Sequence, residues 1–260
     1  MVNLALIGVG RWGQKILQEA HFLSGVKITH LCSPHVVLKK VSGNFTKLTD
    51  YRDLAKIPSI DGVIIAVPPS LHFEIISYFI SRKINIFVEK PMVTSFADAN
   101  KIKSLLEGKN IVFRVGHVYL HNEAFITFAK LVKKENSIKS FKIVLTGPDE
   151  FDSMRALWEW APHALSMLSA ICGRKVTSID VSVPSLGKVV MQIRYGLLTV
   201  EIIIGSGYKL KKRFVTITTD RKKLIFNERS VKKVIVTENN ITYYPSYARV
   251  SPLQRELESF

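Results

Sequence analysis

The chain has 260 residues, of which 47% are hydrophobic, and its formal net charge at pH 7 is +16. The hydrophobic content excludes a disordered chain, and no apolar run is long enough for a membrane span. We therefore expect a cytoplasmic protein of one large or two modest domains, with no membrane partner. The 25 lysines and 12 arginines are dispersed along the chain, and no nucleic-acid recognition motif accompanies them. The charge thus favours anionic small ligands over nucleic acid.

The amino-terminal segment NLALIGVGRWGQKIL leads from an apolar run through three glycines directly into a helical pattern. This order predicts a dinucleotide phosphate-binding turn, because a strand and a helix flank the glycines. Gly8 allows a tight turn, Gly10 lets the backbone approach a pyrophosphate, and Gly13 lets the helix pack closely on the strand. The helix start at Arg11 and Trp12 offers backbone N–H groups to the phosphates. The alternative is an ordinary glycine-rich turn between a strand and a helix.

Residues 1–117 alternate strand-like and helical segments, which is typical of a parallel sheet covered on both faces. The expected strands lie at 4–8, 26–32, 44–48, 62–67, 84–88 and 111–115. The expected helices lie at 11–23, 51–56, 71–82 and 95–107. The first domain is therefore predicted to be a doubly wound α/β Rossmann domain.

Residues 118–260 follow a different pattern, with few helices and a long run of strands. Helices are expected at about 122–134 and 162–172, and strands at 139–146, 176–183, 187–195, 197–205, 212–219, 222–227 and 232–237. Successive strands without intervening helices predict a mostly antiparallel open sheet with helices on one face. The second domain is thus predicted to be an α+β domain. The two cysteines, Cys32 and Cys172, form no C-x-x-C pair, so we expect two buried thiols and no metal.

Two strand ends in the first domain carry polar groups at the sheet edge where open α/β sheets bind ligands. One strand ends in AVPPSLH at 66–72, where the prolines hold the chain rigid. The next ends in Glu89, Lys90 and Pro91. Lys90 is either an ion-paired surface residue or a proton donor that faces a cofactor.

A third candidate segment lies in the second domain at LWEWAPHAL, residues 157–165. Pro162 suits the first turn of a helix, which puts His163 near the amino end of that helix. Histidine takes up a proton near neutral pH, and Glu159 stands four residues earlier, where it could orient the imidazole. The alternative is a structural histidine at an aromatic-rich helix start.

Taken together in order, these segments resemble the glucose–fructose oxidoreductase, inositol dehydrogenase and rhizopine catabolism family, usually written Gfo/Idh/MocA. The resemblance covers nearly the whole chain. It consists of GVGRWG at 8–13, AVPPSLH at 66–72, EKP at 89–91, GHVYLHNEAF at 116–125, WEWAPHALSML at 158–168, RYG at 194–196 and PLQRELESF at 252–260. The segments at 116–125 and 158–168 look most like a subgroup that acts on nucleotide-linked sugars.

The resemblance implies a role for each matching residue. Lys90 would touch the reacting hydroxyl, His163 matches the catalytic histidine, and Glu159 matches a position usually held by aspartate. The cofactor, NAD or NADP, would be bound by Gly8, Gly10, Arg11, Trp12, Gly13, Ser33, Pro34, His35, Ala66, Val67, Pro68, Pro69, His72, Glu89 and Lys90. The candidate substrate contacts are Tyr119, Asn122 and Arg155.

Three departures from the family pattern qualify this interpretation. Ser33 stands where an NAD-type carboxylate is expected, and His35 lies nearby, so the 2′-phosphate of NADP is tolerable and NADP is slightly favoured. Glu159 is one methylene longer than the usual aspartate. The sequence ends at Phe260, inside a segment that family members continue as a final helix.

The sequence therefore predicts a two-domain NAD(P)-dependent oxidoreductase that transfers a hydride between nicotinamide and a secondary alcohol of a sugar, with a nucleotide-linked sugar favoured. The alternative is a catalytically weak or inactive regulator or partner subunit that binds a dinucleotide or a sugar. Alternation in the second sheet, as at Val189 and Met191, leaves one face for the helices. The other face would stay wet unless a second subunit covers it, which predicts a homodimer or a dimer-based tetramer.

Overall fold

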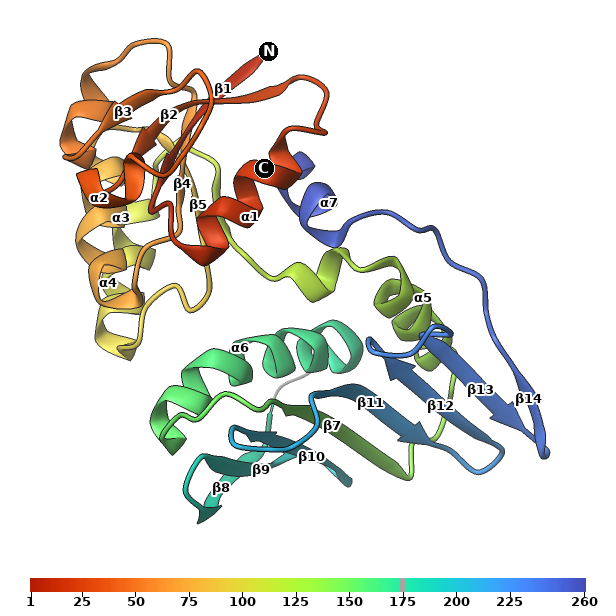
Figure 1. The fold of residues 1–260 in the computed structure, drawn as a ribbon. Coiled ribbons are helices and arrows are strands. Elements are labelled where there is room, and N and C mark those ends of the chain that lie inside the picture. The colour runs from red at the N-terminus through yellow and green to blue at the C-terminus, as the bar shows by residue number, and fades with distance from the viewer. Residues whose placement is uncertain (174–175) are drawn as a thin grey trace. The chain divides into compact units, whose positions relative to one another are not determined.

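The computed structural model describes residues 1–173 and 176–260, and the chain divides into two compact units (Figure 1). The first unit comprises Met1–His117 together with Leu253–Phe260, and the second comprises Val118–Pro252. The domain boundary predicted from the sequence instead assigned all of residues 118–260 to the second domain. Each unit is described here by itself.

The first unit is built on a six-stranded parallel sheet with the strand order β3-β2-β1-β4-β5-β6. Its strands are β1 (Val2–Ile7), β2 (Val26–Cys32), β3 (Thr46–Leu48), β4 (Gly62–Ile65), β5 (Asn85–Val88) and β6 (Phe113–Val115). Its amino-terminal helices are α1 (Arg11–Ala20), α2 (His35–Leu38), η1 (Tyr51–Lys56), η2 (Pro69–Leu71), α3 (His72–Ser81) and α4 (Phe96–Leu106). The strand order is that of a dinucleotide-binding Rossmann fold, which confirms the predicted fold class.

Burial follows the position of each strand in this sheet. All four residues of the central strand β4 are buried, whereas none of the three residues of the edge strand β3 is. The apolar run at 62–65 is continuous because helices cover both faces of a parallel sheet. Hydrophobic runs therefore placed the strands correctly, within a few residues at each end.

The carboxyl-terminal helix α7 (Pro252–Glu258) packs with the first unit, because its apolar side chains are buried there. Leu253 and Leu257 are each 2% exposed. The ring of Phe260 meets that of Phe87 on β5 edge-on, with 5.9 Å between centroids. The chain thus returns to the parallel sheet after completing the second unit.

The second unit is an eight-stranded sheet with the order β14-β13-β12-β11-β7-β10-β9-β8. All neighbouring strands are antiparallel except β7 and β10, which run parallel. The strands are β7 (Ser140–Thr146), β8 (Ser178–Ser185), β9 (Lys188–Tyr195), β10 (Leu198–Gly205), β11 (Lys212–Thr218), β12 (Lys222–Asn227), β13 (Val234–Glu238) and β14 (Ile241–Tyr243). The helices are η3 (Val118–His121), α5 (Glu123–Val132) and α6 (Ser153–Cys172). This mostly antiparallel sheet confirms the predicted α+β class.

One face of this sheet forms a core with α5 and α6 (Figure 1). Alternate residues of β9 and β10, such as Met191 and Ile202, are buried against the helices. Phe125 and Phe128 of α5 pack on Phe226 of β12. The period of two in these strands therefore reports correctly which side chains face the helices.

The helix α6 differs from its prediction, because it begins nine residues before Pro162. Asp152 is its N-cap, and the Asp152 carboxylate accepts the N–H of Arg155 at 2.8 Å. Pro162 lies inside the helix, where its missing N–H leaves the carbonyl of residue 158 without that intrahelical donor. Glu159 and His163 consequently lie one turn apart on the same face of one continuous helix.

Within the described residues, no helix combines the length and the apolar character that a membrane span requires. The predicted pair of buried thiols is correct only for Cys32, because Cys172 at the end of α6 is partly exposed. Burial raises the pKa of the Cys32 thiol to about 12, so this thiol stays protonated.

Candidate functional site

The glycine turn after β1 has little room at two of its three glycines. Gly8 has φ of +93°, and a Cβ added there would lie 2.5 Å from the carbonyl oxygen of Ala66. A Cβ at Gly13 would lie 2.0 Å from the carbonyl oxygen of Gly8. Any side chain at these positions would therefore push the turn, β4 and α1 apart.

The middle glycine has the opposite surroundings, because a Cβ at Gly10 would meet nothing within 4 Å. Gly10 is exposed and is the N-cap of α1, with no side-chain capping bond among the described residues. The open space and the N–H groups of the first helical turn fit a dinucleotide pyrophosphate. Arg11, the first residue of α1, is exposed at this point.

The indole of Trp12, which was predicted to contact a phosphate, is hydrogen-bonded to a carboxylate of the first unit. Its Nε1–H donates to Oε1 of Glu89 at 2.5 Å, which joins α1 to the end of β5. The Nζ of Lys15 lies 4.9 Å from the centre of the same ring. The side chain of Trp12 therefore braces the turn, whereas its backbone stays in the first turn of α1.

The end of β2 places Ser33 beneath the glycine turn. Ser33 is 7% exposed, and its hydroxyl accepts the N–H of Val9 at 3.4 Å. Pro34 and His35, which follow it, are exposed. Ser33 is thus buried and supports the turn, whereas Pro34 and His35 beside it are open to solvent.

The segment after β4 includes Ala66, Val67, Pro68 and Pro69, all of which are partly or fully exposed. His72 differs from its prediction as a cofactor contact, because its side chain is fully buried. Its Nε2 lies 2.9 Å from the carbonyl oxygen of Val67. Its Nδ1 lies 2.9 Å and 3.1 Å from the carbonyl oxygens of Pro91 and Met92. His72 therefore ties the two predicted cofactor edges together.

Lys90 lies next to a buried carboxylate at the end of β5. Glu89 is 8% exposed, and its Oε2 accepts the backbone N–H of Lys90 at 3.2 Å. The backbone of Gly116, after β6, lies against the same carboxylate, since a Cβ there would be 3.1 Å from Oε2. The parallel sheet thus brings the predicted residues Trp12, Glu89 and Lys90 together at one edge.

In the second unit, His163 is buried within an aromatic cluster. It is 9% exposed, and its ring centroid lies 5.2 Å from that of Tyr119 and 6.5 Å from that of Trp160. The Tyr119 hydroxyl donates to Oε2 of Glu228 at 2.7 Å. Burial, followed by the charge of Glu228, raises the pKa of Tyr119 well above its ordinary value, so the hydroxyl keeps its proton.

Two predicted substrate contacts are used for structure, and a third is exposed. Tyr119 is 6% exposed and bonded to Glu228, so it packs beside His163. Asn122 caps α5, because its Oδ1 accepts the N–H of Ala124 at 3.0 Å. Arg155 is exposed in the first turn of α6 and lies over the ring of Phe151.

Sequence reasoning missed Arg213, the largest side chain in the second unit that is almost fully buried. It is 2% exposed, its Nη1 donates to the carbonyl oxygens of Thr146 and Lys212, and its guanidinium lies 3.7 Å from the centre of the Trp160 ring. Arg213 precedes Val215 and Ile217 by two and four residues, so strand alternation was the signal that it points inward.

The guanidinium of Arg213 and the indole of Trp160 leave two N–H donors beside Gly147. Neither Nη2 of Arg213 nor Nε1 of Trp160 has a hydrogen-bond partner within the described part of the chain. A Cβ at Gly147 would lie 3.7 Å from Nη2 and from Cζ2 of Trp160. Burial lowers the pKa of Arg213, which the charges of Glu228 and Glu159 oppose. Two N–H groups without an acceptor among the described residues therefore lie beside Gly147, in the same cluster as the ring of His163.

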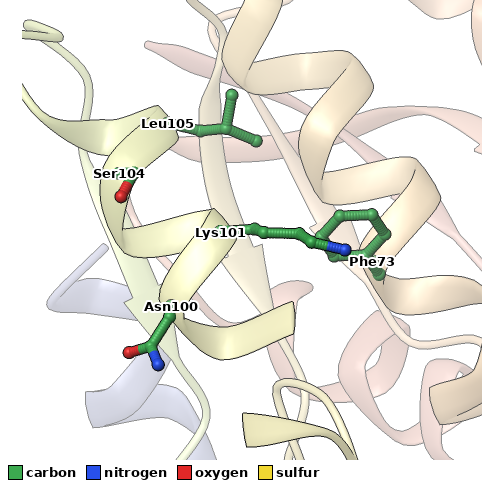
Figure 2. A pocket seen from close by; sticks show the side chains of 5 residues that line it. All are labelled: Phe73, Asn100, Lys101, Ser104 and Leu105. Carbon is green, nitrogen blue, oxygen red and sulfur yellow. The ribbon is translucent and has the colours of Figure 1, made fainter. Parts of the chain in front are cut away.

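A separate hollow of the first unit lies between α3 and α4 (Figure 2). Figure 2 shows Lys101 reaching from α4 toward the ring of Phe73 on α3, with Nζ 5.5 Å from the ring centre. No residue predicted to bind the cofactor lines this hollow, which is bordered by Phe73, Asn100, Lys101, Ser104 and Leu105. Across residues 1–173 and 176–260, no cluster of three or more potential ligands could hold a metal ion.

Comparison with known proteins finds a family model that matches most of the first unit. Residues 2–117 match the family model described as the oxidoreductase family with an NAD-binding Rossmann fold, GFO_IDH_MocA. The rhizopine catabolism protein MocA of Rhizobium meliloti is 28% identical over 117 residues, which cover 44% of this chain and 37% of that protein. A dTDP-3,4-didehydro-2,6-dideoxy-α-D-glucose 3-reductase of Saccharopolyspora spinosa is 31% identical over 72 residues, 28% of this chain and 22% of that protein. These matches span less than two thirds of either relative.

Solved structures resemble the chain over nearly its full length. A 3-ketoreductase of Actinomadura kijaniata, in complex with TDP-benzene and NADP, has a TM-score of 0.86 and 13% identity, and the match covers 99% of this chain and 87% of that one. A biliverdin reductase of Synechocystis, in complex with biliverdin and NADP⁺, has a TM-score of 0.80 and 17% identity, with 98% and 87% coverage. At such identities the likeness establishes the fold alone, and the two neighbours share NADP but hold chemically unlike second ligands.

The geometry of the turn predicts opposite effects for Gly10→Ala and Gly13→Ala. Gly10 has φ of −72°, which alanine adopts, and free space at the Cβ position, so Gly10→Ala should leave the melting temperature within about 2 °C of wild type. If a pyrophosphate occupies that space, the Cβ of the alanine in Gly10→Ala should weaken NADPH binding by at least about tenfold. Gly13→Ala should lower the melting temperature by several degrees, because overpacking costs about 1–3 kcal/mol.

Thermal unfolding and titration of nicotinamide fluorescence measure the two effects separately. Unchanged NADPH affinity in Gly10→Ala would show that the ligand does not approach the backbone at this turn.

Proposed function

We propose that the protein is an NAD(P)-dependent oxidoreductase acting on a secondary alcohol of a sugar, because residues 2–117 match the model of the Gfo/Idh/MocA oxidoreductase family with its NAD-binding Rossmann fold. The observation that carries the proposal is the edge at which the glycine turn, Glu89 and Lys90 meet. The turn supplies a phosphate cradle, and Lys90 supplies an ammonium group at the ends of the parallel strands.

We further propose that the sugar is linked to a nucleotide. A relative acts on a dTDP-linked sugar, and a structural neighbour was solved with a TDP ligand. The net charge of +16 favours an anionic substrate, because it raises the rate of encounter. The two N–H donors beside Gly147 complement the oxygen atoms of a sugar.

In this proposal, the bound nicotinamide accepts or supplies the hydride at C4. Lys90 polarises the reacting hydroxyl group as an ammonium group or deprotonates it as the neutral amine. The imidazole of His163 receives or relays the hydroxyl proton, and Glu159, one turn earlier on α6, orients that imidazole. Tyr119 packs edge-on against the imidazole and limits its movement. The two acid–base groups belong to different units of the chain.

The chemistry can be tested with Lys90→Met and His163→Asn. Each substitution removes a proton-transfer group and keeps most of the side-chain volume, so each should lower kcat by about two orders of magnitude. NADPH binding should persist in both variants. Lys103→Met, which removes an exposed lysine from α4 of the same unit, is the matched control and should keep wild-type turnover. A panel of nucleotide-linked sugars with both cofactors provides the assay.

Glu159→Asp separates an oriented imidazole from a displaced one. A gain in turnover would mean that the longer arm of Glu159 displaces His163, and a loss would mean that the site is adapted to glutamate. Unchanged kcat in both Lys90→Met and His163→Asn would refute the proposed site. Saturable dinucleotide binding without turnover of any sugar would favour a regulatory or partner subunit.

The proposed cofactor preference is for NADP, because no carboxylate follows β2 to repel a 2′-phosphate. Ser33→Asp should therefore weaken NADPH binding by at least about tenfold more than NADH binding. Ser33 also accepts the N–H of Val9, so Ser33→Ala is the control for lost support of the turn. That variant should weaken both cofactors equally. A strong preference of the wild-type protein for NADH would contradict the proposal.

We also propose that the second unit pairs with a second copy through the sheet face that α5 and α6 leave open. This face carries Val190 and Ile203, which are directly paired across β9 and β10, beside the ion pair of Lys142 with Glu201. Ile203→Lys should convert a homodimer or tetramer into smaller species, because it places a charge in the apolar contact. Light scattering at micromolar concentration measures the change. A monomeric wild-type protein would exclude this assembly.

A further inference from the structure

The carboxyl-terminal helix inserts a buried carboxyl group into the first unit. Glu256 of α7 is 2% exposed, although its neighbour on the same helix, Glu258, is exposed. One oxygen of Glu256, Oε1, accepts the backbone N–H of His117 after β6. The other, Oε2, has no hydrogen-bond partner among the described residues. Such burial is costly for an ionised carboxylate with a single donor.

A second buried carboxyl group contacts the same short segment of backbone. Glu89 lies against Gly116, which immediately precedes His117. Two N–H groups donate to Glu89, from the Trp12 indole at 2.5 Å and from the Lys90 backbone at 3.2 Å. The Gly116–His117 segment is therefore contacted by one carboxyl group with two donors and one carboxyl group with a single donor.

Glu89 and Glu256 are both buried and contact adjacent residues of one segment. Ionising both carboxyl groups therefore carries an electrostatic cost. The two donors favour the negative charge on Glu89, so the proton belongs on Glu256. Burial, followed by the charge of Glu89, raises the pKa of Glu256 to about 8, although the His117 N–H opposes the shift. At neutral pH the Oε2 of Glu256 is thus a potential O–H donor.

We propose that Glu256 is a positioning residue that keeps its proton, so that the pair of buried carboxyl groups Glu256 and Glu89, which contact the same Gly116–His117 segment, carries one proton and one negative charge. Because a neutral Glu256 does not repel Glu89, Glu89 keeps its hydrogen bonds from the Trp12 indole and the Lys90 backbone, and the protonation of α7 is coupled to the glycine turn and to the end of β5. The effect on NADPH binding rests on the proposed function, whereas the proton on Glu256 does not.

The pair makes the first unit sensitive to alkaline pH. The titratable groups on the segments that meet here are Glu89, Lys90, His117 and, on α7, Arg255 and Glu258. The pKa of Glu256 is higher in the folded protein than in the unfolded chain, so the folded protein binds the extra proton. Its contribution to stability is complete below about pH 4.5 and is lost as the pH rises to about 8. Above that value a second negative charge faces Glu89.

The test compares Glu256→Gln with Glu258→Gln, an exposed glutamate on the same helix. The glutamine amide can accept from His117 and stays uncharged beside Glu89 at every pH, as the protonated acid does. Relative to wild type, the melting temperature of ligand-free Glu256→Gln should rise by at least about 5 °C between pH 5 and 8 and then stay level. Glu258→Gln should track the wild type throughout this range.

Titration with NADPH between pH 7 and 9.5 provides the second measurement. The dissociation constant of the wild type should increase at least about threefold, and that of Glu256→Gln should stay nearly constant. A constant difference in melting temperature between Glu256→Gln and wild type would overturn the proton assignment, whether or not NADPH binds. The expected melting curves with no NADPH binding would support the pair and refute the oxidoreductase proposal. Equal pH profiles for NADPH would exclude the positioning role.

Discussion

The close approach of backbone segments at the carboxyl ends of β1, β4, β5 and β6 is the constraint on which the first unit depends. Gly8 meets Ala66 so closely that a Cβ at Gly8 would be 2.5 Å from the Ala66 carbonyl oxygen, whereas Gly116 lies against the side-chain carboxylate of Glu89. A side chain could not fit between Gly8 and Ala66, so the polar groups at the edge are supplied by a few long residues that cross it. The geometry of the edge is therefore fixed by the chain itself before any ligand binds.

His72 and Glu89 are the side chains that cross this edge. His72 links the segment after β4 to the segment after β5 through three carbonyl oxygens. Glu89 links β5 to α1 through Trp12. Because both side chains are buried, moving either one would leave backbone or carboxylate groups without hydrogen bonds in a medium of low dielectric constant. Lys90, which lies between these two links in the chain, is thereby held at its backbone.

The sequence predicted the elements well wherever burial has a regular period, and it failed where the partner of a polar group is backbone. Continuous apolar runs located the parallel strands, and alternation located the core of the second sheet. No sequence pattern shows that His72 faces carbonyl oxygens, whereas Asn122 at the start of an expected helix is typical of an N-cap and was interpreted only as a substrate contact. The predicted start of α6 was wrong because Pro162 is typical of a first helical turn, whereas Asp152 caps the helix ten residues earlier. Proline alone therefore did not mark the helix boundary.

The polar cluster around His163 contains a buried charge, the guanidinium group of Arg213, which lowers the stability of the second unit relative to an apolar core. A guanidinium group 2% exposed within a core of Ile, Val and Phe is expensive, and apolar side chains of similar volume often stabilise such a position. Arg213 is balanced by the charges of Glu228 and Glu159, yet one of its nitrogens and the nearby indole nitrogen have no partner within the described residues. These donors fit the sugar ligand proposed above, which would supply oxygen acceptors. The same strand alternation that puts Val215 and Ile217 into the core puts Arg213 there, so the unit positions this cation through its sheet register.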